Sequence, residues 1–246
     1  MRGSNFTACD PLLQSKRISP SLKGASFVKA LFFGSIGTIV ETSRLQYDAF
    51  HAAFAQHHLD WHWDLPTYQE MLKISGGAKR ISTFADKRNE QVDATAVHAT
   101  KTSWFLEKLQ SDDIKPLSYV GVGLKAAQEH GIKTGFVSTT EKATVRIIAQ
   151  KLVAEGHPDF DIMTHGGLGL PGKPEPDAYI HAFETLGIEA QNAIVIEDNV
   201  DGVAAAKTTG ARVVGVPGAF AQQTDLRAAD TTVASGSDID WARLLG

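Results

Sequence analysis

The chain has 246 residues, 43% of them hydrophobic, and its 24 basic and 28 acidic residues give a net charge of −4. A chain of this size can bury a core of its own, and the absence of long runs of either sign argues against a nucleic-acid-binding protein. Cys9 is its only cysteine, which excludes an intrachain disulfide and cysteine metal sites and fits a reducing cytoplasm.

Residues 1–27 are rich in serine and weakly basic, and they contain no apolar segment that could serve as a secretory signal. We predict a flexible N-terminal tail here, with a transit peptide as the alternative. The longest apolar stretches of the chain are far shorter than the roughly 20 residues that cross a bilayer, so we expect no membrane span.

From Val28 onward, short apolar runs alternate with longer stretches of helical period, which is typical of strand–helix repeats that build a parallel sheet. The strand-sized runs are 28–33, 134–137, 160–164, 193–196 and 212–216, and helices are predicted over 123–130, 142–155, 176–186 and 202–209. A glycine follows or ends each helical stretch, as expected for a helix C-terminus. The sequence therefore predicts an α/β protein with a Rossmann-like parallel sheet.

About 100 residues separate the first two strands, far more than one crossover helix requires. Between 44 and 115 the apolar residues recur at spacings of three and four, for example Leu45, Ala49 and Phe50. We therefore predict an inserted all-helical cap at 44–115 on a core formed by 28–43 and 116–246. Histidines and tryptophans at 57–63 are interpreted as cap packing rather than a zinc site or a base-stacking surface.

Ligands of open α/β sheets bind beyond the carboxyl ends of the strands, so the residues after each strand are the candidates. Ser138 and Thr139 follow one strand and could bind a phosphate, although a helix cap would use the same hydroxyls. Lys173 follows a glycine-rich loop and could neutralise a phosphate, although a solvated lysine is the simpler interpretation.

Glu197 and Asp198 follow the strand at 193–196. Adjacent carboxylates repel each other unless a cation offsets them, and hard oxygen ligands suit Mg²⁺. The alternative is a helix cap, with Asn199 or Asp201 opening the next helix.

In order along the chain, Phe32-Phe33 before Gly37-Thr38, then Ser138, then Lys173-Pro174, then Glu197-Asp198 resemble the four motifs of the haloacid dehalogenase superfamily. The resemblance covers about residues 28–220. The segments 59–64, 73–81 and 98–102 are similar to the cap of Rubisco-associated xylulose bisphosphate phosphatases, and β-phosphoglucomutases share the helical-cap arrangement. The family implies magnesium bound by Glu197, Asp198 and a main-chain carbonyl, here that of Ile36, and phosphate bound by Ser138, Thr139 and Lys173. Lys79 and Arg80 are candidate substrate contacts, with a solvated basic loop as the alternative.

The chain departs from this family at the first motif, where an aspartate nucleophile and an aspartate acid/base are the rule. Gly34 and Ile36 occupy the two positions. Neither side chain can attack phosphorus or transfer a proton, so the family route is closed. Ser35 is an alternative nucleophile, but strand alternation points it away from the position-34 side chain, and no base accompanies it.

The resemblance implies two functions. The first is a sugar-phosphate phosphatase whose activity is weak or lost; the second is a pseudoenzyme that binds a small phosphorylated metabolite as a binding or regulatory module. In both, loss of the aspartate at position 34 weakens the magnesium site. We expect a cytoplasmic monomer or weak dimer.

Overall fold

The structure is a computed structural model that describes residues 27–34, 36–74, 76–111, 114–218 and 225–246. The predicted tail therefore lies outside the described residues, apart from Phe27. Strands are β1 (Ala30–Phe33), β2 (Lys133–Val137), β3 (Ile162–Thr164), β4 (Ala193–Glu197), β5 (Arg212–Gly215) and β6 (Thr231–Thr232). Helices are α1 (Ser43–Gln56), α2 (Leu65–Leu72), α3 (Gly77–Arg88), α4 (Ala94–Ser111), α5 (Ser118–Glu129), α6 (Lys142–Ala154), α7 (Asp177–Leu186), α8 (Val200–Thr208) and α9 (Trp241–Leu245). Short 3-10 turns are η1 (Ile36–Thr38), η2 (Gly166–Leu168), η3 (Ala190–Asn192) and η4 (Gly236–Asp238).

The described strands form one sheet in the order β3-β2-β1-β4-β5-β6, and every neighbouring pair is parallel. The predicted α/β fold with a Rossmann-like parallel sheet is therefore confirmed. Strand β1 lies between β2 and β4, at the point where the strand order reverses direction. In such sheets this reversal opens the crevice that takes the ligand. The sequence did not predict β6, because its two residues are exposed threonines that form no apolar run.

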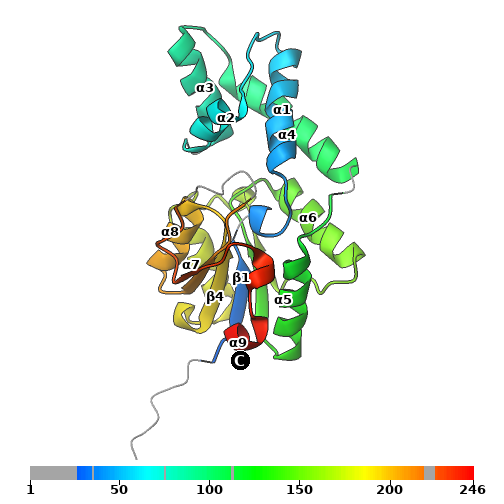
Figure 1. Ribbon diagram of the computed structural model, residues 1–246, viewed down its shortest axis with the longest axis vertical. Coiled ribbons are helices and arrows are strands. Elements are labelled where there is room, and N and C mark those ends of the chain that lie inside the picture. Colours follow the sequence, from blue (N-terminus) through cyan, green and yellow to red (C-terminus); the bar gives the residue numbers. More distant parts are fainter. Residues whose placement is uncertain (1–26, 35, 75, 112–113, 219–224) are drawn as a thin grey trace, which may run out of the picture.

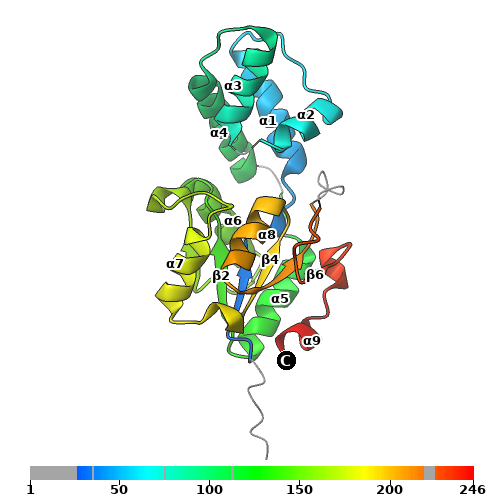
Figure 2. The same cartoon turned by 90° about the vertical axis from the view of Figure 1, so that its left-hand side faces the viewer.

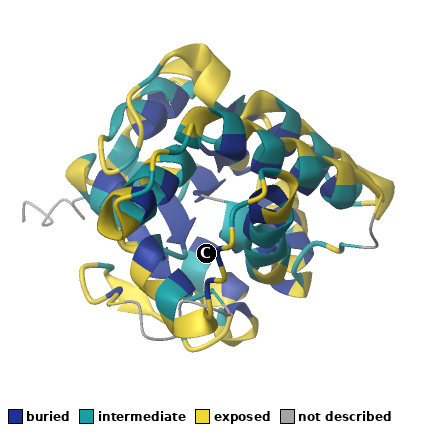
Figure 3. Ribbon diagram, turned by 90° about the horizontal axis from the view of Figure 1, so that it is seen from above, coloured by how far each residue is buried: buried dark blue, intermediate teal, exposed yellow. Residues whose placement is uncertain are grey.

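Helices cover both faces of the sheet: α7 and α8 lie on one side and α5 and α6 on the other (Figure 1). All four residues of β1 are buried, and they alternate between the two cores. Leu31 and Phe33 pack with residues of α5, α6 and α9, whereas Ala30 and Phe32 pack with α7 and α8. This period-2 alternation explains why the run is apolar throughout. Figure 3 shows the buried strand residues inside the surrounding helices.

Helices α1–α4 form a separate group beyond the carboxyl ends of the strands (Figures 1 and 2). Their core is aromatic and includes Phe50, Trp61, Trp63 and Tyr68, which confirms that the tryptophans are packing residues. The two chain crossings between sheet and helical group run side by side, because Val40 pairs with Pro116 in an antiparallel bridge. The domain limits at 43/44 and 115/116 stay a prediction.

Helix α5 begins at Ser118, five residues before the predicted start. Two glycines, Gly121 and Gly123, obscured the helical pattern because glycine disfavours helices. Tertiary packing accounts for both: a Cβ on Gly121 would lie 2.1 Å from the ring of His157, and one on Gly123 would lie 2.7 Å from Trp241. No described helix has the length and apolarity that a bilayer crossing requires.

Candidate functional site

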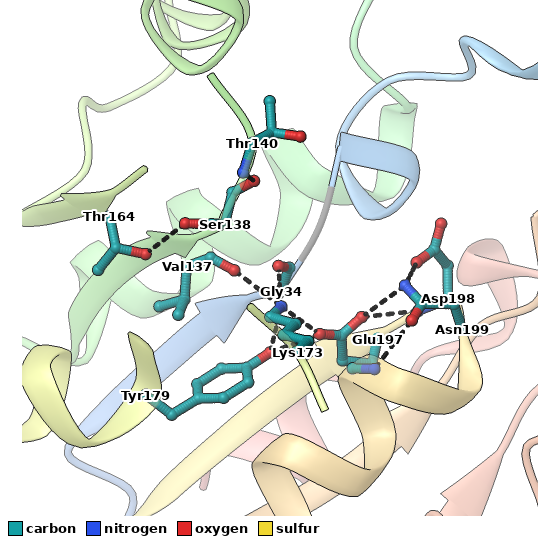
Figure 4. Close-up of polar contacts among 11 residues, drawn as sticks. Gly34, Val137, Ser138, Thr140, Thr164, Lys173, Tyr179, Glu197, Asp198 and Asn199 are labelled. Atoms are coloured by element: carbon teal, nitrogen blue, oxygen red, sulfur yellow. Dashed lines mark hydrogen bonds and ion pairs between the residues drawn. The ribbon is translucent and has the colours of Figure 1, made fainter. Parts of the chain in front are cut away.

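The residues after β1, β2 and β4 meet at one edge of the sheet. The register pairs Phe33 with Phe136 of β2 and with Ile196 of β4, so the three strands end at nearly the same level. The backbone N–H of Gly34 extends this pairing by donating to the carbonyl of Ile196 at 2.9 Å. Gly34, Ser138 and Glu197 are consequently brought together, as the motif order predicts (Figure 4).

Lys173 reaches this edge from the loop before α7, and its side chain is only 8% exposed. Its ammonium nitrogen lies 2.6 Å from Oε1 of Glu197 and 2.9 Å from the carbonyl oxygen of Val137. It also donates to the carbonyl of Gly34 and lies 3.2 Å from the hydroxyl of Tyr179. An ammonium has three N–H donors, so these oxygens engage all of them. The interpretation of Lys173 as a solvated lysine is therefore wrong.

Tyr179 on α7 is a member of this cluster that the sequence analysis missed. Its hydroxyl donates to Oε1 of Glu197 at 2.6 Å, and the side chain is completely buried. Burial, together with the negative charge of Glu197, raises the pKa of Tyr179 well above its ordinary value, so the hydroxyl stays protonated and remains a donor. Its one sequence signal was a phenol on an otherwise apolar helix face, which usually finds a hydrogen-bond partner when buried.

The volume beside Gly34 is filled by this cluster. A Cβ built on Gly34 would lie 2.1 Å from Oε1 of Glu197 and 2.2 Å from the hydroxyl of Tyr179. Non-bonded atoms do not approach each other this closely, so any side chain at position 34 requires Glu197 and Tyr179 to move. The space beside Gly34 is thus occupied by two polar side chains, those of Glu197 and Tyr179. Ser35, the alternative nucleophile, lies outside the described residues.

Asp198 points away from Lys173, toward η1. A Cβ on Gly37 would lie 1.8 Å from Oδ2 of Asp198, so the carboxylate packs directly on that glycine. Its other oxygen, Oδ1, accepts a 2.7 Å hydrogen bond from the amide of Asn199. Asn199 also caps α8, because its side-chain oxygen accepts from the N–H of Gly202 at 2.8 Å. The capping alternative is thus confirmed for Asn199.

The predicted phosphate loop follows β2. Ser138 is buried, its hydroxyl accepts a 3.1 Å hydrogen bond from the N–H of Thr140, and its carbonyl accepts from the hydroxyl of Thr164 at 2.8 Å. Thr139 is half-buried. The Ser138 hydroxyl therefore stabilises the turn before α6 and does not cap that helix, whose N-cap residue is Glu141 without a side-chain cap. The neighbouring Val137 carbonyl links the loop to Lys173. The loop thus lies beside the lysine, and the role of Ser138, Thr139 and Lys173 in phosphate binding stays a prediction.

The residues at this edge do not fit a magnesium ion. Glu197 pairs with Lys173 and Tyr179, and Asp198 packs against Gly37. The Ile36 carbonyl, which the family uses as a main-chain ligand, accepts from the N–H groups of Ile39 at 3.0 Å and Val40 at 2.9 Å. Both of its lone pairs are consequently engaged.

The described residues contain no group of three or more histidine, cysteine, aspartate or glutamate side chains placed to hold one metal ion. Mg²⁺ requires near-octahedral oxygen coordination at short range, and an ammonium occupies the space beside Glu197.

The candidate substrate contacts Lys79 and Arg80 are not part of this cluster. Both lie on α3, within the helical group beyond the strand ends (Figures 1 and 2). Lys79 is exposed, whereas the Nε of Arg80 donates to the carbonyl of Ile74 at 2.8 Å, and burial lowers the pKa of Arg80. Their role toward a substrate stays a prediction.

Lys101 of α4 is a second buried lysine that the sequence analysis missed. It is 7% exposed, donates to the amide oxygen of Gln46 and lies over the rings of Phe50 and Phe105 at 5.1 and 5.0 Å from their centroids. Burial, reinforced by the positive charge of Arg80, lowers the pKa of Lys101 to about 7. A cation on an apolar aromatic helix face gives no clear signal in sequence.

The sequence profile of haloacid dehalogenase-like hydrolases matches residues 37–216. Protein CbbY, encoded on a plasmid of Cupriavidus necator, is 32% identical over 211 residues, which are 82% of this chain and 83% of that protein. The CbbY crystal structure from Rhodobacter sphaeroides in complex with phosphate superposes with a TM-score of 0.76 at 28% identity, covering 87% of this chain and 97% of the other. The same values apply to a mutant of that protein in complex with xylulose-(1,5)bisphosphate.

Proposed function

Since this chain belongs to the haloacid dehalogenase-like hydrolase family, we propose that it binds a small phosphorylated sugar at the strand ends beneath α1–α4 and does not hydrolyse it by the family route. The proposal is supported by the residue type at position 34 and by the side chains that surround it. Gly34 has no nucleophilic side chain, and the space beside it is taken by Glu197 and Tyr179. The chain keeps the ability to bind a phosphorylated sugar and has lost the ability to hydrolyse it.

The absence of an acid/base supports the loss of turnover. Ile36 stands where the family has the second aspartate, and its side chain packs against the core cluster on one face of the sheet. Covalent attack and protonation of the leaving oxygen act as a unit, and removing groups that act together lowers rates by several orders of magnitude. An isoleucine and a glycine supply neither step.

Two observations support a phosphorylated sugar as the ligand. CbbY from Rhodobacter sphaeroides has been solved with phosphate and, as a mutant, with xylulose-(1,5)bisphosphate. In this chain Ser138, Thr139 and Lys173 are retained beside one another at the strand ends. We assign the phosphate group to these three residues and a second polar end of the ligand to Lys79 and Arg80. Binding requires Lys173 to exchange one of its present oxygen contacts for a phosphate oxygen.

The second candidate function is a weak sugar-phosphate phosphatase. It is favoured by retention of Ser138, Lys173, Glu197 and Asp198, which form the family site apart from its first motif. Such an enzyme requires an attacking group other than residue 34, and water activated at this edge is the simplest one. Electrostatic stabilisation by Lys173 alone would then leave a low rate.

The two functions are separated by measuring binding and turnover on the same panel of sugar monophosphates and bisphosphates. We expect a panel member to raise the melting temperature of the wild-type protein in proportion to the logarithm of its concentration, with no phosphate released. Ser138→Ala combined with Lys173→Met is expected to abolish that shift. Phosphate release that disappears in Lys173→Met would instead establish the weak phosphatase. A panel without any shift would contradict the binding function.

A further inference from the structure

We infer that the ammonium of Lys173 has replaced the divalent cation at this site, so that the protein holds its anionic ligand without a metal. The part that concerns the ligand rests on the proposed function, whereas the part that concerns the metal stands on the geometry alone. The ammonium of Lys173 is surrounded by oxygen atoms from four separate segments of the chain (Figure 4).

The oxygen atoms around the Lys173 ammonium are the kinds that bind hard cations. They are the backbone carbonyls of Gly34 and Val137, the hydroxyl of Tyr179 and the carboxylate of Glu197. Carbonyl and carboxylate oxygens are also the ligands of magnesium and calcium in proteins. Here the same oxygens coordinate an ammonium, which is tethered to the chain and does not dissociate.

The charges of the site favour this replacement. Glu197 is completely buried and its Oε1 lies 2.6 Å from the Lys173 ammonium, so the pair is neutral together. Asp198 adds one negative charge, so the net charge of these three side chains is −1. A site built on the family pattern would carry two further carboxylates, at positions 34 and 36. With Gly34 and Ile36 in their place, a dication gains much less attraction and meets a fixed positive charge at short range.

The remaining oxygens of the edge have other partners. The carbonyl of Ile36 accepts from Ile39 and Val40, and the Oδ1 of Asp198 accepts from Asn199. Burial and the charge of Glu197 keep Tyr179 protonated, so it donates to the carboxylate instead of serving as an anionic ligand. A divalent ion would have to displace Lys173 and break several of these hydrogen bonds at once.

The first test measures metal binding by the wild-type protein directly. Mn²⁺ binding is followed by the electron paramagnetic resonance signal of the free ion during a titration. The wild-type protein and the Glu197→Gln variant should bind the same amount of Mn²⁺, because Glu197 does not form a metal site. The melting temperature should be the same in EDTA and in millimolar MgCl₂. A Mn²⁺ site in the wild-type protein that Glu197→Gln abolishes would overturn the inference, whatever the protein does with phosphate.

The second test removes the ammonium. Lys173→Met keeps a side chain of similar length and leaves the oxygens of Gly34, Val137, Tyr179 and Glu197 without their cation. We expect this variant to bind Mn²⁺ at least about tenfold more tightly than the wild-type protein, because a like charge has been removed from close range. The matched control, Lys173→Met with Glu197→Gln, should lose the gain. Equal Mn²⁺ affinity in the folded Lys173→Met variant and in the wild type would contradict the replacement.

The third test uses inorganic phosphate as the ligand. The rise in melting temperature that phosphate produces in the wild-type protein should be the same in EDTA and in MgCl₂. A phosphate shift that EDTA abolishes and magnesium restores would overturn the inference. If phosphate and sugar phosphates give no shift under either condition, the proposed function fails, and the Mn²⁺ titrations still decide whether Lys173 excludes the metal.

Discussion

The ammonium of Lys173 lies 2.6 Å from Oε1 of Glu197, and the two side chains are 8% and 0% exposed. A charge pair this deeply buried is costly to desolvate, and it persists only when further hydrogen bonds satisfy both partners. Here Tyr179 and the carbonyls of Gly34 and Val137 supply them. The pair therefore links the ends of β1, β2 and β4.

Breaking this pair should strongly destabilise the fold. Lys173→Met leaves Glu197 buried without its cation, and we expect the free energy of unfolding to fall by about 3–5 kcal/mol. Lys173→Met with Glu197→Gln removes both charges and should recover most of the loss. Urea denaturation monitored by circular dichroism measures all three proteins.

An exposed pair serves as the control for that experiment. Lys207 and Asp230 form a 2.6 Å ion pair with side chains 36% and 38% exposed. Lys207→Met should lower the free energy of unfolding by less than about 1 kcal/mol, because solvent screens the pair. A Lys173→Met variant no less stable than Lys207→Met would show that the buried pair does not organise the site.

Gly34 should tolerate no side chain without rearrangement. We expect Gly34→Ala to lower the free energy of unfolding by about 1–3 kcal/mol, because the new methyl group would overlap Glu197 and Tyr179. Gly172→Ala is the matched control, since a Cβ there meets nothing within 4 Å. Chemical denaturation of both variants checks the difference, and equal stabilities would mean that the space beside Gly34 is open.

Restoring the family aspartates should not by itself restore phosphatase activity. In Gly34→Asp with Ile36→Asp, the new side chain at position 34 competes with Glu197 and Tyr179 for the same space. Adding Tyr179→Phe removes the hydroxyl that would lie 2.2 Å from the new Cβ. We expect the triple variant to release phosphate from sugar phosphates, in magnesium, at least about tenfold faster than the double variant, a difference of about 1.4 kcal/mol in the barrier. A double variant as active as the triple would refute the steric argument.

The stability of the helical group should depend on pH through Lys101. Burial lowers the pKa of Lys101 to about 7 from its ordinary 10.5, so between these values the unfolded chain binds a proton that the folded protein does not. The contribution of Lys101 to the free energy of unfolding therefore rises with pH through this window, by at most about 1.4 kcal/mol per pH unit. Lys101→Met lacks this term, so the wild type should gain stability relative to it from pH 7 to pH 9.

Urea denaturation of wild type and Lys101→Met at several pH values measures that difference. Lys108 lies on the same helix with its ammonium 5.8 Å from the ring centroid of Trp104, but it is only half-buried, which makes Lys108→Met a suitable control. A wild-type advantage that is independent of pH would show that Lys101 keeps its proton in the folded protein.

The sequence by itself determined five of the six described strands and the absence of a carboxylate at positions 34 and 36. Buried parallel strands require nearly continuous apolar runs, and each of the five predicted runs coincides with an observed strand to within two residues at either end. Gly34 and Ile36 carry no carboxylate, and no fold can give either residue one, so the proposed loss of covalent attack and proton transfer follows from the residue types. The identity of the missing groups is thus a property of the residue types alone.

Only the tertiary structure decided which side chains fill the space beside Gly34 and which groups they contact. Lys173 and Gly34 are separated by 139 positions in the chain, and the partner of the lysine depends on how α7 packs against β2 and β3. The same packing brings Tyr179 to Glu197, and the turn at η1 engages the carbonyl of Ile36. The periodicities of strands and helices follow from local geometry, so they can be recognised from residues that are close in the sequence. The contacts of a buried charge depend on segments that meet only when the chain has folded.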